Sequence, residues 1–110
     1  MRTIKELESA IEIQERVISD KESEIVCKEE DISSLDYEID EMVTDLDECE
    51  DDDEYESIEE DIDDRRDDLV DLEQELEALE NDLIHLENDL GTLEEELEER
   101  QAQESAQTEV

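Results

Sequence analysis

Residues 46–58 read LDECEDDDEYESI, and this stretch separates two heptad repeats. Before it, apolar residues recur every seven positions, which is typical of a coiled coil. The a positions of this first repeat are Ile4, Ile11, Ile18, Ile25, Ile32, Ile39 and Leu46. The a positions of a second repeat are Tyr55, Ile62, Leu69, Leu76, Leu83, Leu90 and Leu97. The five acids from Glu50 to Glu54 lie between the repeats, so the sequence predicts two helices interrupted at this point.

The two repeats are related by a fold of the chain at Asp52. The d positions are Leu7, Gln14, Lys21, Lys28, Leu35, Met42 and Cys49 in the first repeat, and Ile58, Arg65, Leu72, Leu79, Leu86, Leu93 and Arg100 in the second. If paired residue numbers sum to 104, every a residue faces a d residue, as antiparallel helices require. A parallel dimer of one continuous helix would instead have to absorb a phase shift at its centre. The pattern therefore favours an all-α antiparallel coiled-coil hairpin over that dimer.

The bounds of the hairpin follow from the same repeats. We expect helices near 4–49 and 55–100, joined by an acidic loop at 50–54, so that residues 1–100 form one domain. Thr3 and Glu6 fit a capping box, and Asp53 with Glu56 can open the second helix. The loop has neither Gly nor Pro, which counts against a tight turn. Residues 101–110 lose the pattern, and we expect a frayed polar tail.

Some residues depart from a simple two-helix seam. Gln14, Lys21, Lys28 and Arg65 occupy seam positions, and we expect their stems to lie along the seam with the polar heads in solvent. The first helix also carries apolar residues off the seam. Because a two-helix hairpin buries little, these residues could pack against a second copy in a four-helix bundle. This candidate dimer face consists of Ile13, Val17, Val26 and Cys27.

The charge of the chain is extreme and unevenly distributed. It has 45 acidic and 8 basic side chains, for a formal charge of -37. Most of the e and g positions that flank the seam are acidic on both helices, so like charge faces like charge, which costs stability at low salt. Residues 1–49 carry a net charge of -12 (17 acids, 5 bases) and residues 50–110 one of -25 (28 acids, 3 bases). A purely structural rod would not need this arrangement.

The charge density is close to that of duplex DNA. A hairpin with arms of about 46 residues would be about 70 Å long and about 20 Å across. Its -37 charge then amounts to about one charge per 1.9 Å, against about one per 1.7 Å for the duplex. A protein surface that binds DNA phosphates would meet a comparable field.

The sequence offers no catalytic or metal-binding pattern. His85 is the only histidine, at an outward position, and we expect it to be solvated. There is no Gly-rich phosphate loop and no Cys/His metal spacing. A rod has no cleft in which paired carboxylates acquire the different pKa values that acid–base catalysis needs. We therefore expect no enzyme activity, no catalytic residue, no metal site and no cofactor.

The expected location is the cytoplasm. The longest apolar run has three residues, too short to span a membrane, and the first residues lack the apolar segment of a secretory signal. Cys27 and Cys49 would lie about 33 Å apart on one helix, too far for a disulfide. This fits a reducing compartment.

In size, charge and helical build, the chain resembles the acidic DNA-mimic inhibitors of phages and mobile elements, namely anti-CRISPR and antirestriction proteins. The resemblance covers no defined motif. It implies a partner that is a basic, nucleic-acid-binding host protein or complex, inhibited by competition, and no direct binding to nucleic acid or membrane. The acids that we expect to contact the partner are Asp51, Asp52, Asp53, Glu59, Glu60, Asp61, Asp63, Asp64, Asp67, Asp68, Asp71, Glu75, Asp82 and Asp89.

Three other functions fit parts of the sequence. A structural adaptor would bind another coiled coil through the seam and the apolar face of the first helix. A halophile protein would use its acids for solubility in molar salt, although acids concentrated in one half are less expected there. A chaperone or buffer for basic proteins would bind many cationic partners without preference.

Overall fold

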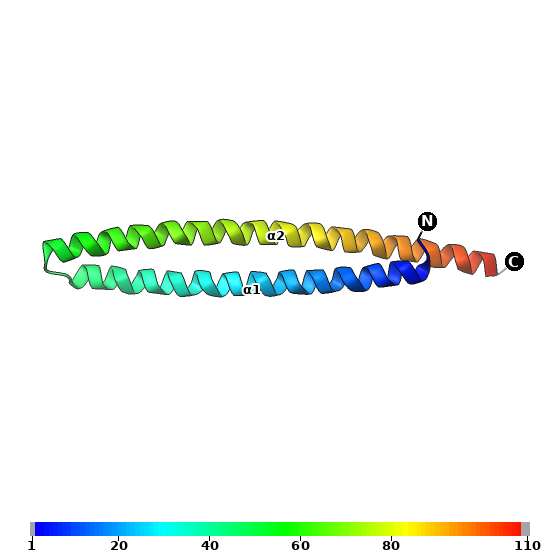
Figure 1. Ribbon diagram of the computed structural model, residues 1–110, viewed down its shortest axis with the longest axis horizontal. Coiled ribbons are helices and arrows are strands. Elements are labelled where there is room, and N and C mark those ends of the chain that lie inside the picture. Colours follow the sequence, from blue (N-terminus) through cyan, green and yellow to red (C-terminus); the bar gives the residue numbers. More distant parts are fainter. Residues whose placement is uncertain (1, 109–110) are drawn as a thin grey trace. The chain divides into compact units, whose positions relative to one another are not determined.

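The computed structural model describes residues 2–108, which form two long helices. Helix α1 comprises Ile4–Glu48 and helix α2 comprises Asp52–Thr108 (Figure 1). No strand occurs among the described residues. The predicted all-α antiparallel hairpin is therefore confirmed.

The hairpin divides into two compact units, and each contains a segment of both helices. The loop unit consists of residues 24–79 and includes the turn between the helices. The terminal unit consists of residues 1–23 and 80–110. Within each unit, the two segments run side by side in opposite directions (Figure 1).

The buried residues all lie at predicted seam positions. In the loop unit, Leu35 and Ile39 of α1 pack with Ile62 of α2. Six more apolar side chains surround this cluster: Met42, Val43, Leu46, Ile58, Leu69 and Leu72. Ile25 is also buried there, and Leu7 and Ile18 are buried in the terminal unit. Most seam leucines of α2 remain half-buried, because one partner helix covers only part of each side chain.

Ion pairs between the helices confirm the register. Lys21 pairs with Asp82 at 3.8 Å in the terminal unit, and Lys28 pairs with Glu75 at 2.7 Å in the loop unit. A third pair joins Arg65 to Glu38 at 3.4 Å. The two residue numbers of each pair sum to 103, one less than the expected 104, so the chain folds back at the predicted place.

The loop is shorter than predicted. It comprises residues 49–51, because α2 begins at Asp52 and not near residue 55. The Asp51 carboxylate caps this helix by accepting the N–H of Asp53 at 3.0 Å and that of Glu54 at 3.5 Å. The predicted cap at Asp53 was therefore wrong, since in this run of acids the carboxylate of Asp51 is the one within reach of the free N–H groups. No described residue other than glycine has a positive φ, so the turn needs no glycine.

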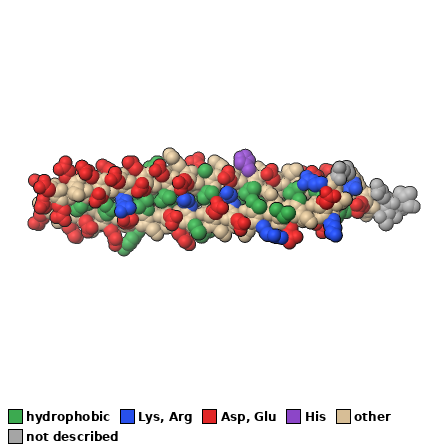
Figure 2. Space-filling view, in the orientation of Figure 1, with side chains coloured by type: hydrophobic (Ala, Val, Ile, Leu, Met, Phe, Trp, Pro, Cys, Tyr) green, Lys and Arg blue, Asp and Glu red, His purple; other side chains and the backbone are tan. Residues whose placement is uncertain are grey.

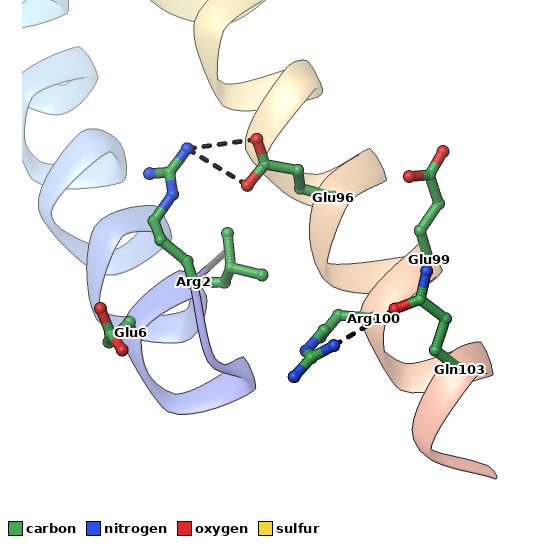
Figure 3. A pocket seen from close by; sticks show the side chains of 7 residues that line it. Arg2, Glu6, Glu96, Glu99, Arg100 and Gln103 are labelled. Carbon is green, nitrogen blue, oxygen red and sulfur yellow. Dashed lines mark hydrogen bonds and ion pairs between the residues drawn. The ribbon is translucent and has the colours of Figure 1, made fainter. Parts of the chain in front are cut away.

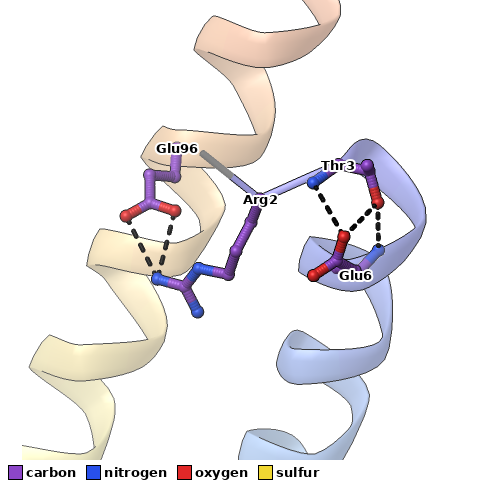
Figure 4. Close-up of polar contacts among 4 residues, drawn as sticks. All are labelled: Arg2, Thr3, Glu6 and Glu96. Atoms are coloured by element: carbon purple, nitrogen blue, oxygen red, sulfur yellow. Dashed lines mark hydrogen bonds and ion pairs between the residues drawn. The ribbon is translucent and has the colours of Figure 1, made fainter.

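The outer ends of the helices differ in how well they were predicted. At the start of α1, Thr3 Oγ1 accepts the N–H of Glu6 at 3.1 Å, and Glu6 Oε1 accepts the N–H of Thr3 at 3.5 Å (Figure 4). The capping box is therefore confirmed. Helix α2 continues to Thr108, beyond the expected end near residue 100. The reason is that residues 101–106 are Gln, Ala, Glu and Ser, without a Gly or Pro to end the helix. Residues 109 and 110 of the expected tail lie outside the described residues.

Candidate functional site

The acidic charge is concentrated in the loop unit. Residues 24–79 hold 28 acidic and 3 basic side chains, a net charge of -25. The terminal unit holds 17 acidic and 5 basic side chains, a net charge of -12. Acidic side chains crowd the end of the molecule that carries the loop (Figure 2). The acidic region thus includes the C-terminal half of α1, which the division of the sequence at residue 50 had assigned to the weakly charged half.

The candidate contact acids fall mostly in this unit. Twelve of the fourteen lie in the loop unit, and Asp82 and Asp89 lie in the terminal unit. All fourteen are exposed. Glu75 and Asp82 differ from the majority because each pairs with a lysine of α1, which leaves less net charge at their positions.

The turn of the loop unit and the helix ends beside it carry only acidic charges. Residues 45–64 contain 14 acidic side chains and no basic one. Asp52, Asp53 and Glu54 lie in the first turn of α2, where the helix dipole stabilises negative charge. The last turn of α1 has no basic residue, although a cation would be favourable there. The turn therefore gathers negative charge from both helices, and for α1 this has a cost in stability.

The polar residues of the seam are paired, which sequence reasoning missed. The side chains of Lys21 and Lys28 are only 21% and 25% exposed, and each reaches a g-position carboxylate of α2. The hydrogen bond to Glu75, with the nearby charge of Asp31, raises the pKa of Lys28. Gln14 Nε2 donates to the Leu86 carbonyl at 2.9 Å. The sequence signal for these pairs is a cation at d that faces a g-position acid of the other helix.

The carboxylates near Arg65 line a shallow groove in the loop unit. The groove passes over Leu35 and Leu72 and is bordered by Asp31, Glu38, Asp68 and Asp71. Arg65 already reaches Glu38, so a guanidinium fits among these acids. Lys or Arg side chains of a partner would find the same chemistry. Within residues 2–108, no group of three His, Cys, Asp or Glu side chains is arranged to hold a metal ion.

A second hollow, in the terminal unit, contains charges of both signs. Arg2 lies across it from Glu96, at 3.1 Å, and Arg100 Nη1 donates to Gln103 at 3.2 Å (Figure 3). Glu6, Leu7 and Glu99 complete the lining. Because two arginines stand among its three glutamates, this hollow adds little to the acidic surface.

The candidate dimer face is exposed but belongs to two units. Ile13 is 58% exposed and Val17 39%, and both lie in the terminal unit. Val26, 53% exposed, and the exposed Cys27 lie in the loop unit. The exposed apolar residues also include Tyr37, Val70 and Ile84, which the sequence analysis did not single out.

Comparison with protein-family models, with curated proteins and with solved structures finds no match to the chain. Among the described residues, neither helix contains a stretch that is long and apolar enough to cross a membrane.

Proposed function

We propose that this protein is an acidic DNA mimic, which binds the basic nucleic-acid channel of a host defence or DNA-processing enzyme and inhibits it by competition. The observation that carries the proposal is the charge density of the loop unit. From Asp52 to Leu79, α2 rises by about 40 Å. The net charge of -25 on this unit then corresponds to about one charge per 1.6 Å, against about one per 1.7 Å of duplex DNA.

The way in which the acids are held supports the same function. They project from two packed helices, so their positions are largely set before a partner arrives, which lowers the entropy cost of binding. The width of two packed helices, about 20 Å, is that of a duplex. Lys and Arg side chains that bind phosphates could therefore pair with these carboxylates without rearrangement. Such a protein would act in the cytoplasm of the host cell and would bind no nucleic acid itself.

Capture from a bacterial lysate tests this function. The protein would be immobilised at near-physiological salt and the retained proteins identified by mass spectrometry. One variant removes five charges from the loop unit through Asp63→Asn, Asp64→Asn, Asp67→Asn, Asp68→Asn and Asp71→Asn. A matched control removes five from the terminal unit, none of them among the candidate contact acids, through Glu12→Gln, Asp20→Asn, Glu95→Gln, Glu98→Gln and Glu99→Gln.

A DNA mimic is expected to retain one dominant nucleic-acid enzyme or complex, and added DNA should displace it. The loop-unit variant should lose this partner, and the control should keep it. A dominant partner that survives both the loop-unit variant and excess DNA would contradict the proposal. Many basic partners without a preferred one would indicate a buffer for cationic proteins.

A structural adaptor is the second candidate, favoured by the exposure of Ile13 and Val17 on α1. Substitution of these two residues by Asn leaves the charge unchanged. An adaptor would then lose its partner, whereas a DNA mimic would keep it. The same capture experiment therefore separates the two functions.

A further inference from the structure

The two flanks of the seam differ in the terminal unit. In an antiparallel pair, the g positions of both helices border one side of the seam and the e positions border the other. On the g side, Asp82 pairs with Lys21, and Glu96 pairs with Arg2. The e side carries six exposed glutamates, and no ion pair to any of them occurs within residues 2–108. These e-side glutamates are Glu8, Glu15, Glu22, Glu80, Glu87 and Glu94.

An apolar strip runs between the two rows of glutamates. The a positions border the e side, and Ile11, Leu83 and Leu90 at these positions are only half-buried. At position b, on the outer side of the α2 glutamates, Ile84 is 55% exposed and extends the apolar surface. Gly91 occupies the same outer position one heptad further along, and a Cβ placed there would meet no atom within 4 Å, so the surface there is open. The e side of the terminal unit therefore offers apolar contact flanked by negative charge on both sides.

We propose that the e side of the terminal unit is a docking surface for an amphipathic helix of a partner protein, with Lys or Arg on both flanks of an apolar seam. Charge complementarity selects this occupant. The apolar residues of the partner would cover the strip, and its cations would neutralise the two rows of glutamates. A second copy of this chain is a poor occupant because it would bring the same acidic flanks.

The e side of the loop unit does not offer the same surface. There, Arg66 and Val43 occupy two of the e positions, so the rows of acids are interrupted. Cationic helix binding to the terminal unit would relieve the repulsion between its glutamates and so stabilise the hairpin by linkage. This docking surface goes beyond the DNA-mimic function, since it uses the unit with less charge.

A synthetic peptide can test this surface on the full chain. The probe is a three-heptad helix with Leu at a and d and Lys at e and g. Affinity would be measured by titration calorimetry at about 0.15 M salt, where distant charges are screened. Changes in the amide chemical shifts of the protein on addition of the peptide would locate the binding site. We expect the shifts to cluster in residues 4–22 and 80–97 and the melting temperature of the hairpin to rise.

Two charge-matched variants separate a docking surface from general attraction. The first changes Glu15, Glu22, Glu80 and Glu87 to Gln on the e side. The control changes Asp20, Glu95, Glu98 and Glu99 to their amides elsewhere in the same unit. We expect about a tenfold loss of peptide affinity in the first variant, from several exposed ion pairs, and a much smaller loss in the control.

The apolar surface beside the strip has its own matched pair of variants. Ile84 and Val70 occupy the same heptad position on α2, and they are 55% and 51% exposed. Ile84→Asn should lower the affinity for the peptide by about fivefold, because part of one aliphatic contact is lost. Val70→Asn, in the loop unit, should leave the affinity unchanged.

Three results would overturn this proposal. The two charge variants could lower the peptide affinity equally, the chemical-shift changes could cluster in residues 24–79, or Ile84→Asn could leave the affinity unchanged. None of these results bears on the DNA-mimic function, which depends on the loop-unit aspartates. Conversely, failure of the loop-unit capture would leave the peptide result unaffected.

Discussion

Lys28 shows how a seam position in this hairpin can hold a charge. Its stem lies in the seam, and its ammonium reaches Glu75 at 2.7 Å, close to Asp31. Lys28→Glu would place a third carboxylate beside these two, so we expect the melting temperature to fall by about 5 °C or more. Lys5→Glu makes the same charge change at an exposed outward position of α1 and should have little effect. Thermal unfolding followed by circular dichroism compares them, and equal effects would mean that the seam pair has no special role.

The same residue gives the hairpin a pH dependence in alkaline solution. The hydrogen bond to Glu75 raises the pKa of Lys28 in the folded state, so the charged form is favoured by folding. Its contribution to stability is complete below the pKa of the unfolded chain, about 10.4, and is lost as the pH rises through the folded value. Lys28→Arg stays charged throughout. We expect the wild type to lose stability relative to this variant above about pH 10.5, and parallel curves in denaturant titrations would contradict the pairing.

At the scale of the helices, the caps set where each one begins. Thr3→Ala removes the acceptor for the Glu6 N–H, and we expect a loss of about 1 kcal/mol of unfolding free energy. Thr92→Ala is the control, because the Thr92 hydroxyl donates to the Asn88 carbonyl within α2 and caps nothing. Denaturant unfolding should show a loss for Thr3→Ala alone. A similar loss in both variants would indicate that the capping box adds nothing.

Gly91 is a weak point in the middle of α2. Its Cβ position is open, and its backbone is helical, so Gly91→Ala is accommodated without strain. We expect a gain of about 0.5–1 kcal/mol, the usual difference in helix propensity. Chemical denaturation measures this gain, and a loss of stability would show that α2 has a different conformation there.

The sequence predicted the elements better than their ends. The heptad pattern sufficed for both helices and their pairing, because burial at a and d depends on periodicity alone. The loop could not be placed as well, since five successive acids supply several possible caps and only the backbone geometry selects Asp51. The pairing of Lys21, Lys28 and Arg65 also depends on the cross-helix register, which fixes the opposing acid for each cation.

On the scale of the whole molecule, repulsion among 45 acidic side chains opposes folding. Salt screens this repulsion, so the melting temperature should rise continuously from about 0.01 M to about 1 M salt. A DNA mimic must already be folded at cellular ionic strength. Helicity that appears only in molar salt would instead support halophile adaptation, and circular dichroism at several salt concentrations distinguishes the two.

The candidate site could be predicted only in part from the sequence. The number of acids and their outward positions follow from composition and heptad phase. The concentration of charge in the loop unit required the fold, since α1 contributes acids that lie far in sequence from those of α2. The contrast between the e side and the g side of the terminal unit likewise emerged only once the ion pairs of the g side were known.

The central claim is that this surface and nucleic acid compete for one channel. The most direct measurement is a titration of the captured enzyme with labelled protein at several concentrations of its DNA or RNA substrate. If the account is correct, the apparent dissociation constant will rise in proportion to the nucleic acid, and no ternary complex will form. A dissociation constant that does not change with nucleic acid, or a complex that contains all three components, would contradict it.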